Sequence, residues 1–189
     1  MGCCRMLCQD PREGCIPPLT PRRSCSRFAQ CEVGFNAGHS ATVWLHGLAT
    51  QLKTFDVFRL PYANASSVFI EQQYPGRVEF IKGPSQVTVP QYIRRFQQGS
   101  APSCDIWFID GDHGHQAPHV DLSNAMQVAS DDAIIIADDC TVRFPAVRQA
   151  WRDLLATGRI QDAWNHTLYA PAPHGHKGWC VGRVGNVSR

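Results

Sequence analysis

The chain has 189 residues, of which 43% are hydrophobic and 18% are charged, and its formal net charge is +2. This length suits one domain with a substantial core, and the residue balance is that of a globular protein. No apolar run approaches the roughly 20 residues needed to span a bilayer, and the small net charge does not indicate a charged polymer or surface as a ligand. We therefore expect neither nucleic acid nor a membrane as a partner.

Residues 1–28 differ in composition from the rest of the chain. They hold five of the nine cysteines, four of the thirteen prolines and five arginines, with no helical or strand period. We expect a disordered Cys/Pro/Arg-rich extension here, followed by a single domain over residues 29–189. The four later cysteines lie in apolar segments, where reduced core thiols are commoner than disulfides: Cys31, Cys104, Cys140 and Cys180. This predicts a reducing, cytoplasmic setting.

From residue 28 onward, short apolar runs alternate with helical patterns. Strands are predicted at 28–33, 52–58, 77–81, 105–109 and 133–137. Helices are predicted between and after them: one with Val43, Trp44 and Leu48 inward, one at 65–73, one opened by Pro90, one at 118–129 and one at 147–155. The last two strands, at 161–169 and 178–184, are joined by a loop too short for a crossover helix. The chain is thus predicted to be an α/β protein, with a doubly wound, mostly parallel seven-stranded sheet and a C-terminal antiparallel β-hairpin.

Open α/β sheets bind ligands beyond the carboxyl ends of their strands. The first strand ends in the pattern E-x-G-x-x-x-G, from Glu32 through Gly34 to Gly38. These glycines allow a ligand to approach the backbone at a helix N-terminus, although a tight turn without a ligand also favours glycine. Asp56 ends the second strand, where a carboxylate can accept both hydroxyls of a ribose, although a lone Asp there is more often a cap or turn residue. Together the two features favour a nucleoside cofactor.

Acidic residues gather after two later strands. Asp110 and Asp112 follow one buried strand, and Asp138 and Asp139 follow the next. Carboxylates crowded at one edge of a sheet are costly unless a cation or a proton neutralises them, and oxygen ligands favour Mg²⁺ or Ca²⁺ over zinc. The alternative is that some of these acids cap helices and bind no metal. His113 stands beside them, and its ordinary pKa suits a general base at neutral pH.

Five segments of the sequence, CEVGFNAGHSA, TFDVF, CDIWFIDGDHGH, IIIADDC and VRQAW, carry a family resemblance. From about residue 29 to 184 the chain resembles class I S-adenosylmethionine-dependent methyltransferases, and among them the methyltransferase domain 24 family, which is related to macrocin-type and catechol-type O-methyltransferases. The resemblance implies that the glycine loop holds the methionine part of S-adenosylmethionine (SAM) and Asp56 the ribose. It implies cofactor contacts from Glu32, Gly34, Phe35, Asn36, Gly38, His39, Ser40, Asp56, Ser85 and Asp110.

The same resemblance assigns the acid cluster. Mg²⁺ would be bound by Asp110, Asp138 and Asp139, and His113 would stand in the place of the catalytic lysine of catechol-type relatives. The implied activity is methyl transfer to a hydroxyl of a small-molecule acceptor, assisted by a divalent cation, with a homodimer left open.

The chain departs from the family pattern in two places. Gly83-Pro84-Ser85 stands where relatives often have Gly-Asp-Ser, which loses a carboxylate expected near the adenine. The helices that usually precede the first strand are replaced by the Cys-rich extension. These departures leave open a non-catalytic methyltransferase-like domain that binds cofactor or partners. An NAD-linked dehydrogenase is a further alternative, but it would need G-x-G-x-x-G, and the run Gly34-Phe35-Asn36-Ala37-Gly38 lacks the middle glycine.

Overall fold

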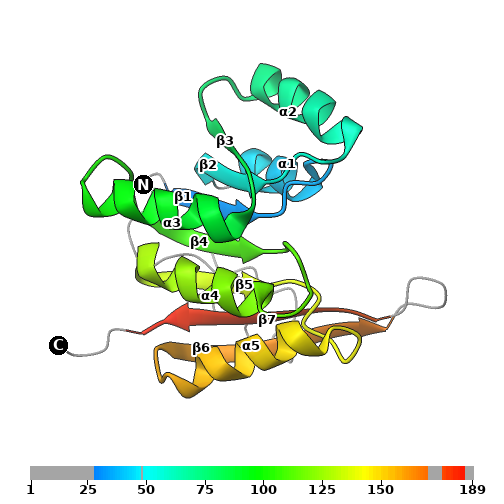
Figure 1. Ribbon diagram of the computed structural model, residues 1–189, viewed down its shortest axis with the longest axis vertical. Coiled ribbons are helices and arrows are strands. Elements are labelled where there is room, and N and C mark those ends of the chain that lie inside the picture. The colour runs from blue at the N-terminus through cyan, green and yellow to red at the C-terminus, as the bar shows by residue number, and fades with distance from the viewer. Residues whose placement is uncertain (1–27, 48, 170–175, 186–189) are drawn as a thin grey trace, which may run out of the picture.

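The computed structural model of the protein describes residues 28–47, 49–169 and 176–185. Seven strands and five helices alternate along this part of the chain (Figure 1). The strands are β1 (Phe28–Val33), β2 (Ala49–Asp56), β3 (Val78–Lys82), β4 (Cys104–Ile109), β5 (Ala129–Ala137), β6 (Ile160–Tyr169) and β7 (His176–Val184). The helices are α1 (His39–His46), α2 (Pro61–Gln73), α3 (Ser85–Gln97), α4 (Ala117–Val128) and α5 (Pro145–Ala156). Among the described residues, no helix is long and apolar enough to cross a membrane.

All seven strands form one sheet in the order β3-β2-β1-β4-β5-β7-β6. The first five strands of this order pair in parallel, whereas β7 runs antiparallel to both β5 and β6. The predicted doubly wound sheet with a terminal hairpin is therefore confirmed. Because the chain order reverses between β1 and β4, their carboxyl ends flank the crevice where open α/β sheets bind ligands.

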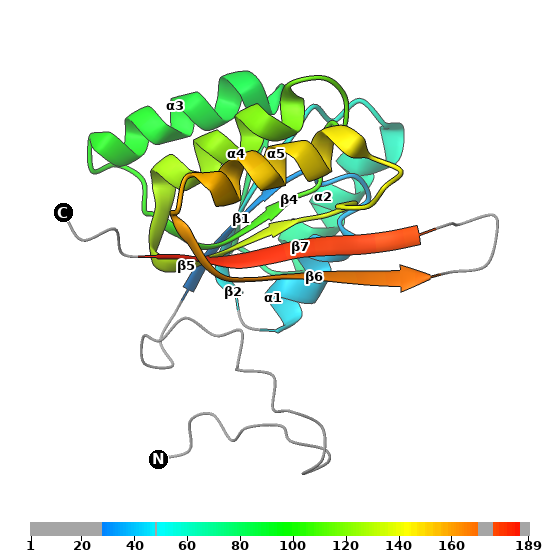
Figure 2. The same cartoon turned by 90° about the horizontal axis from the view of Figure 1, so that it is seen from below.

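Helices cover both faces of the sheet. Figure 2 shows α3, α4 and α5 together on one face and α1 on the other. The first face buries Phe55, Trp107 and Ile135 against the three helices, and the second buries Leu52 with residues of α1 and α2. Burial on both faces explains why β4 and β5 read as continuous apolar runs rather than alternating ones.

Two details of the helices differ from the sequence-based expectation. Pro90 does not open a helix: it lies inside α3, which begins at Ser85. The backbone hydrogen bond that Pro90 cannot donate is offset by burial of its neighbours Val89 and Ile93. Val43 is 68% exposed rather than inward, because the eight-residue α1 packs through Ala41 and Leu45, which are one turn apart. Leu48 lies outside the described residues.

The cysteines of the sheet are the clearest correction. They were expected to be reduced, but the structure joins Cys31 to Cys104 and Cys140 to Cys180, with Cα atoms 5.8 and 5.6 Å apart. The partners are distant in sequence and become neighbours only through the strand order, which the spacing of cysteines does not reveal. These cysteines therefore give no indication of a reducing compartment. The predicted extension, residues 1–28, lies outside the described residues except for Phe28, the first residue of β1.

Candidate functional site

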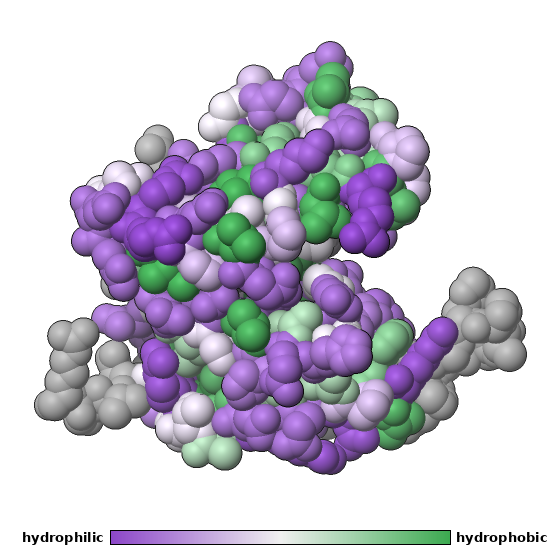
Figure 3. All heavy atoms as spheres, viewed as in Figure 1, coloured by the Kyte–Doolittle hydropathy of each residue, from purple (hydrophilic) through white to green (hydrophobic). Residues whose placement is uncertain are grey.

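The carboxyl ends of β1, β2, β3 and β4 surround a cavity of about 610 Å³. Figure 3 shows the surface hollowed on this side of the molecule, between the part that carries α2 and the part that carries α4 and α5. The lining comes from the ends of these strands, the loops that follow them and the first turns of α2 and α3: Val33, Gly34, Asn36, Phe55, Asp56, Val57, Arg59, Leu60, Ala63, Gly83, Pro84, Ser85, Gln86, Asp110, Gly111 and Asp112. Its volume lies within the range of pockets that hold small molecules and cofactors.

The glycine loop after β1 is shaped first by its packing against β4. Gly34 has φ +95°, and a Cβ atom there would lie 2.0 Å from the carbonyl oxygen of Asp110. The Asp110 amide in turn donates to the carbonyl oxygen of Val33 at 2.8 Å. The first glycine is therefore required so that two strand ends can meet, and it is required whether or not a ligand is bound.

Asp56 fixes the far side of the same loop. Its Oδ2 accepts the amide N–H groups of Phe35 and Asn36 at 2.8 and 3.0 Å, and its Oδ1 accepts the N–H of Phe58. Asn36 and Phe58 both have φ near +50°, a conformation that L residues rarely adopt. The carboxylate thus stabilises two unfavourable turns. It still lines the cavity, where lone pairs beyond these three hydrogen bonds can face a ligand.

A buried acid lies beneath the loop. Glu32 is fully buried at the end of β1, and its Oε2 accepts a hydrogen bond from the Ser40 hydroxyl at 3.0 Å. Its other oxygen, Oε1, makes no hydrogen bond of normal geometry, although the Thr54 hydroxyl is near enough to oppose the rise in the pKa of Glu32. Desolvation raises the pKa of Glu32 to about 8, so the carboxyl is largely protonated at neutral pH. An unpartnered buried oxygen is a vacant acceptor for a positively charged or N–H-bearing ligand group.

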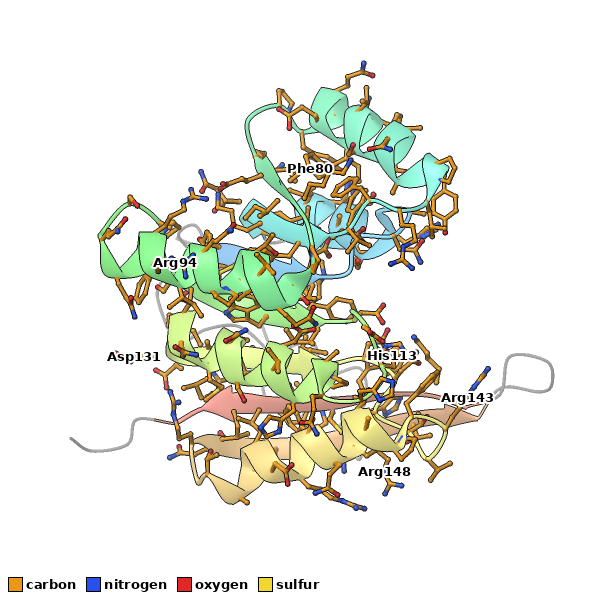
Figure 4. All side chains as sticks on the ribbon, in the orientation of Figure 1. Phe80, Arg94, His113, Asp131, Arg143 and Arg148 are labelled. Atoms are coloured by element: carbon orange, nitrogen blue, oxygen red, sulfur yellow. A yellow bond between two sulfur atoms is a disulfide. The ribbon has the colours of Figure 1, made fainter. Side chains whose placement is uncertain are left out.

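His113 lies between two carboxylates beside the cavity, in the loop that joins β4 to α4 (Figure 4). Its Nε2 is 3.3 Å from Asp110 Oδ1, and its Nδ1 is 3.7 Å from Asp139 Oδ2. The Phe144 ring packs against the imidazole with centroids 4.7 Å apart. Contact with Asp110 raises the pKa of His113, and the charges of Asp139 and Asp138 add to the shift, although burial opposes it.

A lysine from the far edge of the sheet joins this cluster. The ammonium nitrogen of Lys177 lies 2.7 Å from Asp138 Oδ2 and 3.0 Å from Asp139 Oδ1. Burial alone would lower the pKa of Lys177, but the hydrogen bonds to the two carboxylates outweigh it and raise the pKa. The pKa of Asp138 is raised to about 6, mainly by burial and in part by the charge of Asp110, while the hydrogen bond from Lys177 lowers it.

Comparison with known proteins identifies the family. The family model described as Methyltransferase domain, methyltransferase domain 24, matches residues 31–140. The chain belongs to this family. The methyltransferase fold is also found in solved structures, with sequence identities low enough that the likeness concerns the fold alone. No curated protein matches the chain.

Three of these structures show the range of the fold. An O-methyltransferase from Bacillus cereus in complex with SAH has 20% identity and a TM-score of 0.67, over 82% of this chain and 73% of its own. TomG, an O-methyltransferase from Streptomyces achromogenes in complex with SAM, has 18% identity and a TM-score of 0.62, over 86% and 75% of the two chains. The N-methyltransferase NodS from Bradyrhizobium japonicum has 12% identity and a TM-score of 0.61, over 84% and 86%. Both oxygen- and nitrogen-directed methyltransferases are therefore among the structural neighbours.

The structure brings only part of the predicted cofactor set to the cavity. Five of the predicted residues line it: Gly34, Asn36, Asp56, Ser85 and Asp110. Glu32 and Ser40 lie beneath the loop, and Gly38 packs against Ile70 and Phe35. Phe35 turns into the core against Phe58 and Phe80, the latter on β3 beneath α2 (Figure 4), so only its N–H contributes to the loop. His39 is exposed as the first residue of α1.

The predicted metal set is arranged differently from the expectation. The ligand atoms that lie within 4.8 Å of one another belong to Asp110, His113 and Asp139. Asp138 is not in this group; its Oδ1 accepts the Asp139 N–H and its Oδ2 accepts a hydrogen bond from the Lys177 ammonium. Mg²⁺ prefers a near-octahedral shell of oxygen atoms, so two carboxylates and an imidazole do not fit it well. A metal ion bound by these three residues would also take up a nitrogen of His113, the expected general base.

Lys177 is the main residue that the sequence reasoning missed. Polar residues were sought only after strands, yet β7 is antiparallel to β5. Residues at the start of an antiparallel strand lie at the same edge as residues at the ends of its parallel neighbours. The predicted hairpin therefore already contained the signal that would have found Lys177.

Proposed function

We propose that this protein transfers the methyl group of SAM to a hydroxyl oxygen of a small molecule, with His113 as the general base. The observation that carries the proposal is Asp110, which lines the cavity on one side and lies 3.3 Å from the His113 imidazole on the other. A methyl donor in the cavity and a base beside it would thus share one residue. Membership of the methyltransferase family and the SAM and SAH complexes of structural neighbours support the cofactor.

On the cofactor side, the chain offers acceptors suited to the polar ends of SAM. Asp56 lines the cavity and is the acceptor we assign to the ribose hydroxyls. The unpartnered Oε1 of Glu32, beneath the loop, is the acceptor we assign to the α-ammonium of the methionine part. When bound, SAM would supply an electrophilic methyl group: an O–C bond to the acceptor oxygen forms as the C–S bond breaks, and S-adenosylhomocysteine (SAH) is the leaving group.

On the acceptor side, the surroundings of His113 select which nitrogen takes the proton. The Nε2 atom is fully buried and faces Asp110 Oδ1, which favours a proton on Nε2. Nδ1 then carries the lone pair, and it accepts the proton of the acceptor hydroxyl as the oxygen attacks the methyl carbon. The imidazolium that forms lies between Asp110 and Asp139, whose charges stabilise it. No step of this proposal uses a divalent cation.

The experiment compares two histidines. His113→Gln removes the proposed base, while His119→Gln changes a half-exposed histidine on α4 that contacts only Asp153 among the ion pairs of the described residues. SAH binding is measured by calorimetric titration for the wild type and both variants. Methyl transfer from labelled SAM to a panel of phenols and sugars is measured for the same three proteins. We expect all three to bind SAH and only His113→Gln to lose methyl transfer, by about 100-fold or more. Absence of SAH binding by the wild type, or full transfer by His113→Gln, would contradict the proposal.

A further inference from the structure

The acid cluster of this protein already contains a cation of its own. Lys177 reaches Asp138 and Asp139 at 2.7 and 3.0 Å, and these two carboxylates are only 5% and 15% exposed. Charges removed from water to this degree need a close partner of opposite sign. Because β7 begins at the edge where β5 ends, the partner comes from the neighbouring strand rather than from solvent.

Within the acid cluster, the basic side chains alternate with the carboxylates. His113 lies between Asp110 and Asp139, and Lys177 lies between Asp139 and Asp138. The two oxygens of Asp139 thus face different partners, Oδ1 the ammonium and Oδ2 the imidazole. This arrangement brings Lys177 and the proposed base to opposite sides of one carboxylate.

Backbone contacts hold Lys177 in this position. The Cys140 amide, directly after the two acids, donates to the carbonyl oxygen of Gly178 at 2.9 Å, and Cys140 is also joined to Cys180. A Cβ atom at Gly178 would lie 2.9 Å from a methyl carbon of Thr141 and 3.0 Å from the carbonyl oxygen of His166. Only a glycine lets the strand and the loop after β5 approach this closely, so the position of the lysine follows from packing as well as from charge.

We propose that Lys177 is the resident cation of the site, in place of a divalent metal ion, and that it stabilises the acceptor oxygen during methyl transfer. An ammonium group has three N–H donors, and the two carboxylates take two of them. The Lys177 side chain is 45% exposed, so the third donor is accessible to an acceptor. As the hydroxyl proton moves to His113 Nδ1, the oxygen becomes more negative and this N–H stabilises it. Lys177 keeps its own protons throughout.

The role of Lys177 in methyl transfer rests on the proposed function. Its place as the resident cation of the site does not. A divalent ion that used Asp138 Oδ2 and Asp139 Oδ1 would have to displace Lys177 from these oxygens, so the two cations compete there. Removing the ammonium would leave the buried carboxylates uncompensated and should raise the affinity of the cluster for a divalent metal ion.

The test is a titration with Mn²⁺, followed by electron paramagnetic resonance, on four forms of the full chain. They are the wild type, Lys177→Met, Lys177→Arg and the control Arg152→Met, which removes one positive charge from an exposed position on α5. We expect Lys177→Met to bind Mn²⁺ at least about tenfold more tightly than the other three, because only it lacks a cation at the cluster. Equal Mn²⁺ affinity in the wild type and Lys177→Met would overturn the proposal.

Methyl transfer in the presence of EDTA gives the second readout. The wild type is expected to keep its full rate and Lys177→Met to lose about 100-fold or more, with partial activity in Lys177→Arg. Loss of wild-type transfer in EDTA would also overturn the proposal. SAH binding, measured in parallel, reports that each variant is folded. A chain that binds no SAH contradicts the proposed function, while the Mn²⁺ titration still decides whether Lys177 is the resident cation.

Discussion

Replacing Glu32 by glutamine should make the protein more stable at neutral pH. The wild-type carboxyl is fully buried and its pKa is raised from 4.5 to about 8, so the folded protein binds a proton that the unfolded chain releases between these values. The free energy of unfolding must therefore fall as the pH rises from about 4.5 to about 8. Each unit of pKa shift corresponds to about 1.4 kcal/mol, which gives a cost of about 3 kcal/mol at pH 7 and about 4 kcal/mol at pH 8, where the folded protein still holds half of the proton.

Glutamine avoids this cost because it does not ionise, and its amide oxygen can still accept the Ser40 hydroxyl. Urea unfolding of the wild type and Glu32→Gln at intervals between pH 5 and pH 8 measures the difference directly. The exposed Glu71, changed to glutamine, is the control and should leave the slope of the wild type unchanged. Burial also raises the pKa values of Asp121 and Asp138 to about 6, and these two acids contribute equally to both proteins. Parallel pH profiles for the wild type and Glu32→Gln would therefore refute the reasoning.

The same substitution links stability to the proposed cofactor site. If the SAM ammonium contacts Glu32, its charge favours the ionised carboxylate and lowers the pKa of that group. SAM should then bind the wild type more tightly as the pH rises from 6 to 8, and it should bind Glu32→Gln with no such trend. Calorimetry at three pH values would contradict the assignment if both proteins gave the same trend.

Three further predictions concern the loops at the strand ends. Gly34→Ala should destabilise the protein by about 3 kcal/mol or more, because the added Cβ would overlap the Asp110 carbonyl. Gly76→Ala is the control: Gly76 has φ +68° and open space around it, so this substitution should cost only about 1–2 kcal/mol. Thermal unfolding of the two variants measures the difference. Asp56→Ala should lower the unfolding free energy by about 1–3 kcal/mol in urea and weaken SAH binding, because three loop N–H groups lose their acceptor. Methyl transfer should rise with pH through an apparent pKa above 6.5, because His113 has a raised pKa and acts only when neutral; a profile that falls over this range would contradict its role.

Strand ends were the part of the site that sequence patterns could predict. Continuous apolar runs identify β4 and β5 because both faces of these strands are covered, and the first polar residues after such runs must lie at one edge of the sheet. Asp56, Asp110 and Asp139 lie at the carboxyl ends of their strands, as the pattern predicts. It could not say that Asp56 would be occupied by loop N–H groups, because hydrogen-bond partners depend on the turn geometry.

Features that depend on pairing between distant segments were harder to predict. The bonds between Cys31 and Cys104 and between Cys140 and Cys180 require the strand order, which hydrophobic periodicity alone does not specify. Side-chain direction in loops has no periodicity, so the sequence does not show that the Phe35 ring packs into the core; the resemblance implies a cofactor contact for the whole loop. Lys177 is the exception, since the antiparallel hairpin was predicted and would have placed it.

The most direct test of the account is calorimetric titration of the wild type and Asp56→Ala with SAH. The account predicts saturable binding at one site per chain in the wild type, and binding at least about tenfold weaker in Asp56→Ala, which loses both the ordered loop and the ribose acceptor. NAD, titrated in the same way, should give no binding. Binding of NAD without SAH, or SAH affinity unchanged by Asp56→Ala, would contradict the claim that the cavity beside Asp56 is a SAM site.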